Sequence, residues 1–117
     1  MAIKLKRVYE SPDTGDGYRV LVERLWPRGM SKDRAKVDLW LKEAGASTTL
    51  RTWYGHDPEK WEEFRKKYFE EMRSRPDVIK ELRDVIRTRG TVTFLFAAHD
   101  IEHNNALALK EFLEQLQ

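Results

Sequence analysis

One segment of the chain decides its fold: residues 91–97 have the sequence TVTFLFA, a nearly continuous apolar run. Such a run is typical of a β-strand that is covered on both faces of its sheet. A short polar connection follows, and apolar residues at helical spacing then predict a terminal helix over residues 101–116. A buried strand that leads into a helix is the unit from which α/β domains are built.

Two further strands are predicted near the start of the chain. Residues 3–9 alternate apolar and basic side chains, and residues 18–23 form a β-branched run after the turn-forming sequence SPDTGDG at 11–17. The seven-residue connection favours an antiparallel hairpin, because parallel neighbours usually need a longer crossover. The parallel arrangement stays open, and it would bring the ends of strands 18–23 and 91–97 to the same edge of the sheet.

Helices are predicted between the second strand and the last one. Residues 57–74 begin with an Asp-Pro pair, which suits a helix start, and carry apolar side chains at helical spacing. A second helix begins at Pro76, and Ser47 can cap a shorter one, whereas residues 37–44 fit neither helix nor strand clearly. The sequence therefore predicts the α/β class. The expected structure is a small single-domain layered fold with a short sheet of strands 3–9, 18–23 and 91–97, packed by helices 57–74, 76–88 and 101–116.

Composition limits what the protein can be. The 117 residues have room for one domain, and the absence of cysteine excludes disulfides, thiolate nucleophiles and cysteine-ligated metals. The sequence has no apolar run long enough for a membrane span and no signal-peptide pattern, so we expect a cytoplasmic protein without a membrane partner. The 22 basic and 20 acidic residues are interspersed, whereas a dedicated nucleic-acid binder usually has a segregated basic stripe.

The end of the last strand is the place where we expect chemistry. Ligands of open α/β folds bind beyond the carboxyl ends of the strands, and the start of a following helix attracts anions. Asp100 is more simply explained as the N-cap of that helix. His103 is a candidate general base or hydrogen-bond donor, although it could merely fill the helix start. The histidine spacing is too weak to indicate a metal site, and no dinucleotide fingerprint is present, so we predict neither a metal nor a cofactor.

Arginines supply the candidate positive charge. Arg24 and Arg28 flank Trp26 in the sequence RLWPRG, and Arg51 lies farther along the chain. A guanidinium group can hold a carboxylate or phosphate through two hydrogen bonds. If strand 18–23 is parallel to strand 91–97, the RLWPRG loop and the last strand-to-helix loop would together form an anion pocket. The alternative is that these arginines pair with carboxylates and stack on tryptophan.

Three motifs occur in order along the chain: RLWPRG at 24–29, LRxW at 50–53 leading into HDPxxW at 56–61, and FLFAA at 94–98 with DxxHN at 100–104. Together they resemble the YeaO-like branch of the family called domain of unknown function 488. The resemblance implies an α/β fold and a shared pocket, but no reaction. The broader family carries cysteines around the last strand-to-helix loop, where this chain has Phe96, Asn104 and Ala106, so thiol chemistry does not carry over.

The leading hypothesis is a domain that binds a small anionic ligand, for example a phosphate-bearing one, between the RLWPRG loop and the helix start at 100–104. The predicted ligand-binding residues are Arg24, Trp26, Arg28, Arg51, Trp53, Asp100, His103 and Asn104. His103 and His56 are the acid–base candidates if the protein is an enzyme, a question that the sequence leaves open. The alternative is a protein- or nucleic-acid-binding module that uses exposed tryptophans and basic residues. In a third interpretation, these motifs only hold loops on the core.

Overall fold

The predicted central strand is β4 (Thr91–Phe96), and it pairs on both of its edges. Within residues 2–116, the part of the chain that this computed structural model describes, the sheet has four parallel strands in the order β1-β4-β2-β3. The other strands are β1 (Ala2–Arg7), β2 (Tyr18–Leu21) and β3 (Leu39–Trp40). The fold is therefore α/β, as predicted, although the strands are slightly shorter than expected.

The predicted antiparallel hairpin between the first two strands is wrong. Ile3 and Tyr18 both face Val92, because β1 and β2 lie on opposite sides of β4 and run parallel to it. The segment between β1 and β2 returns to the opposite end of the sheet. It passes close to Thr91 of β4 at Gly17, where the backbone has a left-handed φ of 66°. A Cβ atom at Gly17 would lie 2.3 Å from the Thr91 carbonyl oxygen, so this crossing needs glycine. The turn residues at 11–17 correctly predicted an irregular connection between the two strands, but the direction of the second strand was wrong.

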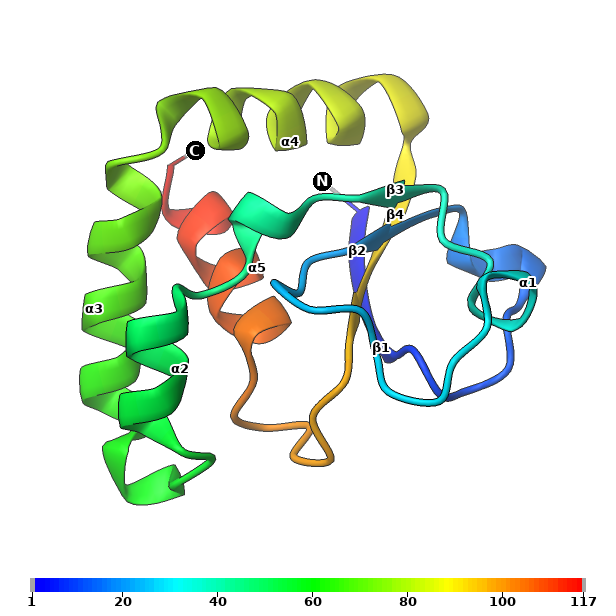
Figure 1. The fold of residues 1–117 in the computed structure, drawn as a ribbon. Coiled ribbons are helices and arrows are strands. Elements are labelled where there is room, and N and C mark those ends of the chain that lie inside the picture. Colours follow the sequence, from blue (N-terminus) through cyan, green and yellow to red (C-terminus); the bar gives the residue numbers. More distant parts are fainter. Residues whose placement is uncertain (1, 117) are drawn as a thin grey trace.

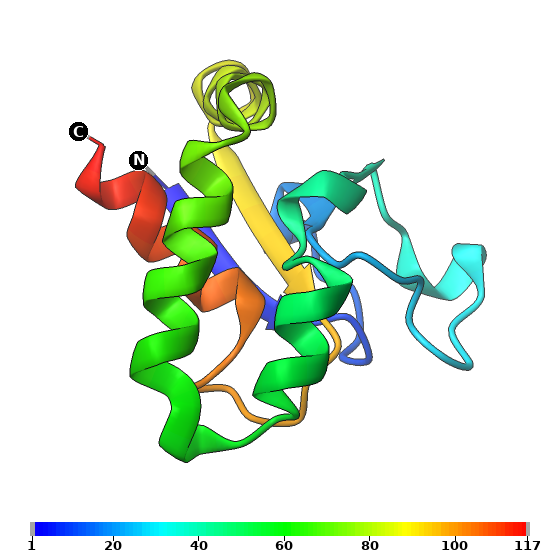
Figure 2. The same ribbon diagram turned by 60° about the vertical axis from the view of Figure 1, so that its left-hand side comes forward.

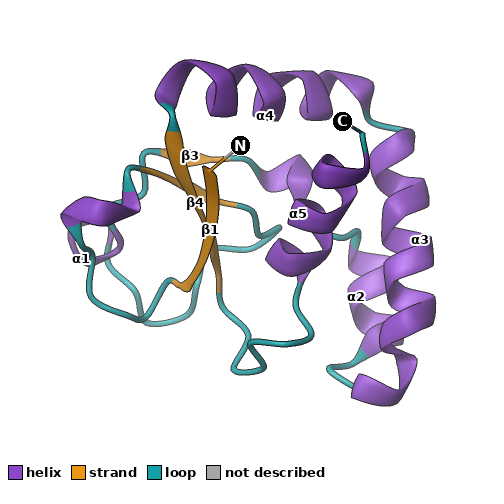
Figure 3. Cartoon of the chain, turned by 180° about the vertical axis from the view of Figure 1, so that it is seen from behind, coloured by secondary structure: helices purple, strands orange, loops and turns teal. Residues whose placement is uncertain are grey.

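Unequal helical layers cover the two faces of the sheet. Helices α2 (Thr48–Tyr54), α3 (Trp61–Arg73) and α5 (Asn105–Gln115) pack on one face, and α1 (Lys32–Ala35) lies on the other (Figure 3). Alternate side chains of β4 point to opposite faces of the sheet: Phe94 packs in the larger core and Leu95 in the smaller one. Because both faces are buried, the strand does not alternate apolar and charged residues, and the hydroxyl of buried Thr93 donates to the Asp16 carbonyl oxygen.

Most of the predicted helix starts are confirmed. Ser47 caps α2, and α3 follows a short 3-10 turn, η3 (Pro58–Lys60), that Asp57 caps. Helices α2 and α3 then lie side by side in antiparallel directions (Figures 1 and 2). The ambiguous segment 37–44 contains the short strand β3 and a 3-10 turn, η2 (Lys42–Ala44).

The terminal helix begins later than predicted. Asp100 is not its N-cap, because the carboxylate of Asp100 accepts hydrogen bonds from the backbone N–H groups of Glu102 and His103 within a preceding turn. Asn104 is the cap, and its side chain accepts from the N–H of Leu107. The apolar spacing that predicted this helix included Leu116, but Leu116 is 42% exposed at its far end.

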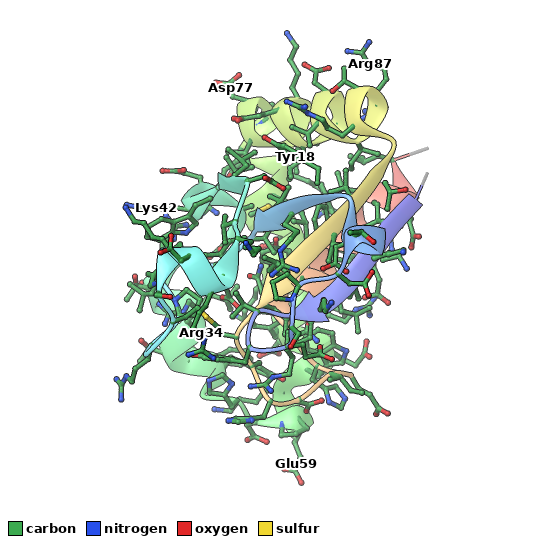
Figure 4. All side chains as sticks on the ribbon, turned by 90° about the vertical axis from the view of Figure 1, so that its right-hand side faces the viewer. Tyr18, Arg34, Lys42, Glu59, Asp77 and Arg87 are labelled. Atoms are coloured by element: carbon green, nitrogen blue, oxygen red, sulfur yellow. The ribbon has the colours of Figure 1, made fainter. Side chains whose placement is uncertain are left out.

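Helix α4 (Pro76–Arg89) lies across the end of the sheet where β4 begins (Figure 1). Ile79, Leu82 and Ile86, which are spaced three and four residues apart, form its buried side. Asp77 and Arg87 extend outward from this helix (Figure 4). None of the helices that the structure describes is long and apolar enough to cross a membrane.

Candidate functional site

Polar side chains gather where the parallel strands end. The loop that follows β4 and the turn between α2 and α3 lie at the same end of the molecule (Figure 1). Between them is a cavity of about 100 Å³, which we call the carboxyl-edge pocket. Its lining residues are Glu23, Ala46, Arg51, Tyr54, His56, Phe64, Ala98, His103, Asn104 and Asn105. Of the predicted residues, the structure brings Arg51, His56, His103 and Asn104 together here.

His103 is held in place from two sides. Its Nδ1 atom lies 2.7 Å from a carboxylate oxygen of Asp100, and its ring meets Trp61 edge-on with centroids 5.3 Å apart. The hydrogen bond to His103 is the main reason that the pKa of Asp100 lies below its usual value. An ionised Asp100 keeps a proton on Nδ1, which leaves Nε2 of His103 as the ring nitrogen for a ligand.

Helix α2 brings Arg51 and Tyr54 to the pocket and ends in a tight turn. Gly55 and His56 both have left-handed backbones, with φ values of 54° and 56°. For a residue other than glycine this conformation is uncommon and costs energy, so the surrounding turn must hold His56 in it. Burial, aided by the charges of Asp100 and Asp57, raises the pKa of Tyr54, whose hydroxyl therefore stays a neutral hydrogen-bond donor.

Glu23 is a pocket residue that the sequence analysis missed. Its Oε1 atom accepts a hydrogen bond from the Ala97 backbone N–H at 3.0 Å, so the carboxylate joins the ends of β2 and β4. Burial raises the pKa of Glu23, while the Ala97 N–H and the charge of Arg51 oppose that rise. In the sequence, Glu23 is the last residue of a β-branched run. A charge at the carboxyl end of a buried strand was the available signal.

Two neighbouring asparagines shape the pocket through backbone hydrogen bonds. The amide group of Asn104 donates to the Asp100 carbonyl oxygen, besides capping α5. Asn105 accepts from the Ala46 N–H at 2.7 Å and donates to the Val22 carbonyl oxygen at 2.8 Å. These contacts join the loop after β4, the end of β2 and the segment before α2. The asparagines therefore act as positioning residues.

The RLWPRG loop does not line the carboxyl-edge pocket. Arg24 donates to the Gly45 carbonyl oxygen at 3.1 Å, and the side chain of Arg28 is exposed. Trp26 packs edge-on against Trp40, and its indole N–H donates to the Met30 carbonyl oxygen. These contacts hold the loop on the core, but within the described residues neither Arg24 nor Arg28 forms the ion pair with a carboxylate that the alternative expected.

Trp53, the remaining predicted residue, also lies outside the pocket lining. The ammonium groups of Lys60 and Lys67 are each 5.2 Å from the centre of its ring. This tryptophan is half-buried and stacks with cations of its own chain.

A larger hollow, of about 850 Å³, lies between α3, α4 and the end of α5. It has an apolar floor that includes Ile79 and Phe112, and a rim that includes Lys80 and Arg83. No histidine lines it, and none of the three sequence motifs reaches it. In residues 2–116, no group of three or more His, Cys, Asp or Glu side chains could hold a metal ion. The chemically varied site is therefore the smaller carboxyl-edge pocket.

An open parallel sheet with helical layers on both faces and a polar pocket at the carboxyl ends of its strands makes this protein a small α/β domain. Residues 2–117 match the model of a family described as the inactive DUF488-N3 subclade, and the chain belongs to this family. It is 37% identical to the uncharacterized protein YeaO of Escherichia coli over 116 residues, which are 99% of this chain and 100% of that protein.

A second relative is the uncharacterized protein Rv3073c of Mycobacterium tuberculosis. It is 39% identical over 111 residues, which cover 95% of this chain and 92% of the relative. No solved structure matches the chain. The family that the three motifs predicted is thus confirmed.

Proposed function

We propose that this protein binds a small oxyanion in the carboxyl-edge pocket. The observation that carries the proposal is the setting of Arg51. Arg51 is half-buried and lines the pocket, and no carboxylate of the described residues lies within the 4.0 Å of an ion pair with its guanidinium group. A partly desolvated guanidinium gains most from an anion that it can hold through two hydrogen bonds.

The surrounding groups supply further donors for an anion. His56 and Tyr54, each of which can donate a hydrogen bond, line the same pocket, and the positive end of the α5 dipole is next to it. A cavity of about 100 Å³ is smaller than the ~300–1,000 Å³ of pockets for drug-sized ligands. The pocket therefore suits an inorganic oxyanion or the terminal acidic group of a larger molecule.

Binding explains the pocket better than catalysis through a thiol or aliphatic hydroxyl nucleophile. The chain has no cysteine, and none of the described lining residues is serine or threonine. The description of the family as an inactive subclade points in the same direction. Asp100 and His103 then serve to orient a hydrogen bond to the ligand, although the same pair would also be the acid–base group of an enzyme.

Substitution of Arg51 tests the proposal, with inorganic phosphate as the probe. We expect Arg51→Gln to weaken phosphate binding by about ten- to a hundredfold, because a hydrogen bond to a charged group contributes ~1.5–3 kcal/mol. Isothermal titration calorimetry at low salt measures the affinity, and the melting temperature shows whether the variant is folded.

Arg28→Gln is the matched control, because Arg28 lies outside the pocket but within the loop that the sequence predicted to bind the anion. We expect it to leave phosphate affinity unchanged. Equal losses in both variants would move the site to the RLWPRG loop. Tight phosphate binding that survives Arg51→Gln would contradict the proposal.

The alternative function, a protein-binding module, draws its support from the larger hollow. Its apolar floor and the basic side chains Arg73, Lys80, Arg83 and Arg87 would suit an acidic amphipathic segment of another protein. Nucleic acid fits this hollow less well, because phosphate contacts do not require an apolar floor. The two candidate functions use opposite ends of the molecule, so binding experiments can separate them.

A further inference from the structure

The carboxyl-edge pocket is lined by an acidic side chain as well as a basic one. Glu23 and Arg51 line the same cavity, yet their charged groups do not approach to the 4.0 Å of an ion pair. One Glu23 oxygen is occupied by the Ala97 N–H. None of the described residues donates a hydrogen bond to the other oxygen. The pocket thus offers a ligand both a guanidinium group and a free carboxylate oxygen.

A carboxylate oxygen restricts which anions can bind beside it. A ligand without a proton would place its own negative oxygen against Glu23, which is repulsive in a partly desolvated site. A ligand that keeps a proton can donate it to Glu23 in a strong O–H···O⁻ hydrogen bond while its other oxygens face Arg51. Sulfate has lost both protons at neutral pH, whereas inorganic phosphate of almost the same size and shape retains at least one.

We propose that the carboxyl-edge pocket selects oxyanions that carry a proton, with hydrogen phosphate as the simplest member. Glu23 accepts the hydrogen bond from the ligand hydroxyl, and Arg51 holds the opposite, charged oxygens. This inference rests on the oxyanion-binding function proposed above and adds the chemical class of the ligand. Glu23 is a specificity-determining residue in this account, since it acts by rejecting the unprotonated anion.

Calorimetric titrations of the full chain with phosphate and with sulfate, at pH 7 and matched ionic strength, test the inference. We expect the wild-type protein to bind phosphate at least tenfold more tightly than sulfate. In Glu23→Gln, the amide oxygen can keep the bond from the Ala97 N–H while the amide nitrogen donates into the pocket. Sulfate binding should therefore improve, and the ratio of the two affinities should fall towards one.

Glu114→Gln is the control, because it makes the same change of charge at an exposed position on α5. It should leave the ratio of affinities as in the wild type. If the wild-type protein binds phosphate and sulfate equally tightly, the proposed selectivity is wrong, but the oxyanion site itself is not. The wild-type titrations alone decide this point. An unchanged ratio in a folded Glu23→Gln protein would overturn the role of Glu23. If neither anion binds to the wild type, the proposed function itself fails.

Discussion

At the scale of single residues, the domain contains a buried ion pair. Asp16 and Arg19 form an ion pair on the face of the sheet opposite the larger core, and both residues are buried. Arg19 also donates to two backbone carbonyl oxygens, those of Ala35 and Lys36, so one guanidinium group connects the start of β2 to the end of α1. Such a pair contributes little compared with an apolar contact, but breaking it leaves a buried charge without its partner.

We expect Asp16→Asn to lower the free energy of unfolding by about 3 kcal/mol at pH 7. Burial alone would raise the pKa of Asp16, but the Asp13 backbone N–H and the side chains of Lys6 and Arg19 lower it overall. The stabilisation is therefore complete above the unfolded-state pKa of about 3.9 and is lost as the pH falls through the lower folded-state value.

Urea unfolding of wild type and variant at pH 7 and at pH 3 measures this effect. The two proteins should differ strongly at pH 7 and converge as the pH falls. Asp84→Asn is the control: Asp84 pairs with Arg87 at the surface, where such pairs contribute ~0–1 kcal/mol. A difference between wild type and Asp16→Asn that stays constant down to pH 3 would contradict the assignment.

At the scale of elements, two capped helix starts fix the walls of the carboxyl-edge pocket. Ser47 caps α2, and its backbone N–H and hydroxyl also donate to Glu71 of α3, which ties these helices together. Asn104 caps α5 on the other side of the pocket. The pocket therefore depends on the helix ends and on the loops that precede them.

Asn104→Ala should lower the free energy of unfolding by about 1–2 kcal/mol, because it removes the N-cap of α5 and the bond to the Asp100 carbonyl oxygen. Chemical denaturation measures the loss, and amide hydrogen exchange should show faster opening in the first turn of α5. Asn104→Ser, which retains a capping oxygen, should recover part of the stability. Equal stability of Asn104→Ala and wild type would show that the cap contributes nothing.

The elements that could be predicted from sequence are those with a local cause. Helix α3 follows from an Asp-Pro start and a periodic apolar face, and β4 follows from a nearly continuous apolar run. The position of β2 could not be predicted, because it depends on both edges of β4 being free to pair and on the crossing at Gly17. Pairing between distant segments leaves no periodic signal in either one.

The candidate site was predictable in part for the same reason. His103 was found because it follows the last strand, Arg51 because a guanidinium group can hold an anion, and His56 because it is a titratable side chain in one of the motifs; all three line the carboxyl-edge pocket. Arg24 points instead to Gly45, since the direction of a side chain that leaves a loop is set by tertiary packing. Glu23 was missed because a single charge at the end of a strand does not show whether it faces the solvent or a cavity.

At the scale of the whole molecule, the two hollows lie at opposite ends of the sheet. The carboxyl-edge pocket is next to the strand ends, whereas the larger hollow lies beside α4, which crosses the end where β4 begins (Figure 1). Each of the two candidate functions requires one of these ends. The location of a bound anion therefore decides between them more directly than its affinity.

The most direct test of the oxyanion site is an NMR titration of the ¹⁵N-labelled protein with phosphate at constant ionic strength. We expect saturable shifts for the backbone amides of residues 97–105 and for the side-chain Nε–H of Arg51, with no change along α4. A matched titration of Arg51→Gln should show these shifts only at much higher phosphate concentration. Shifts centred on Lys80 and Arg83 of α4, or none that saturate, would contradict an anion site at the carboxyl ends of the strands.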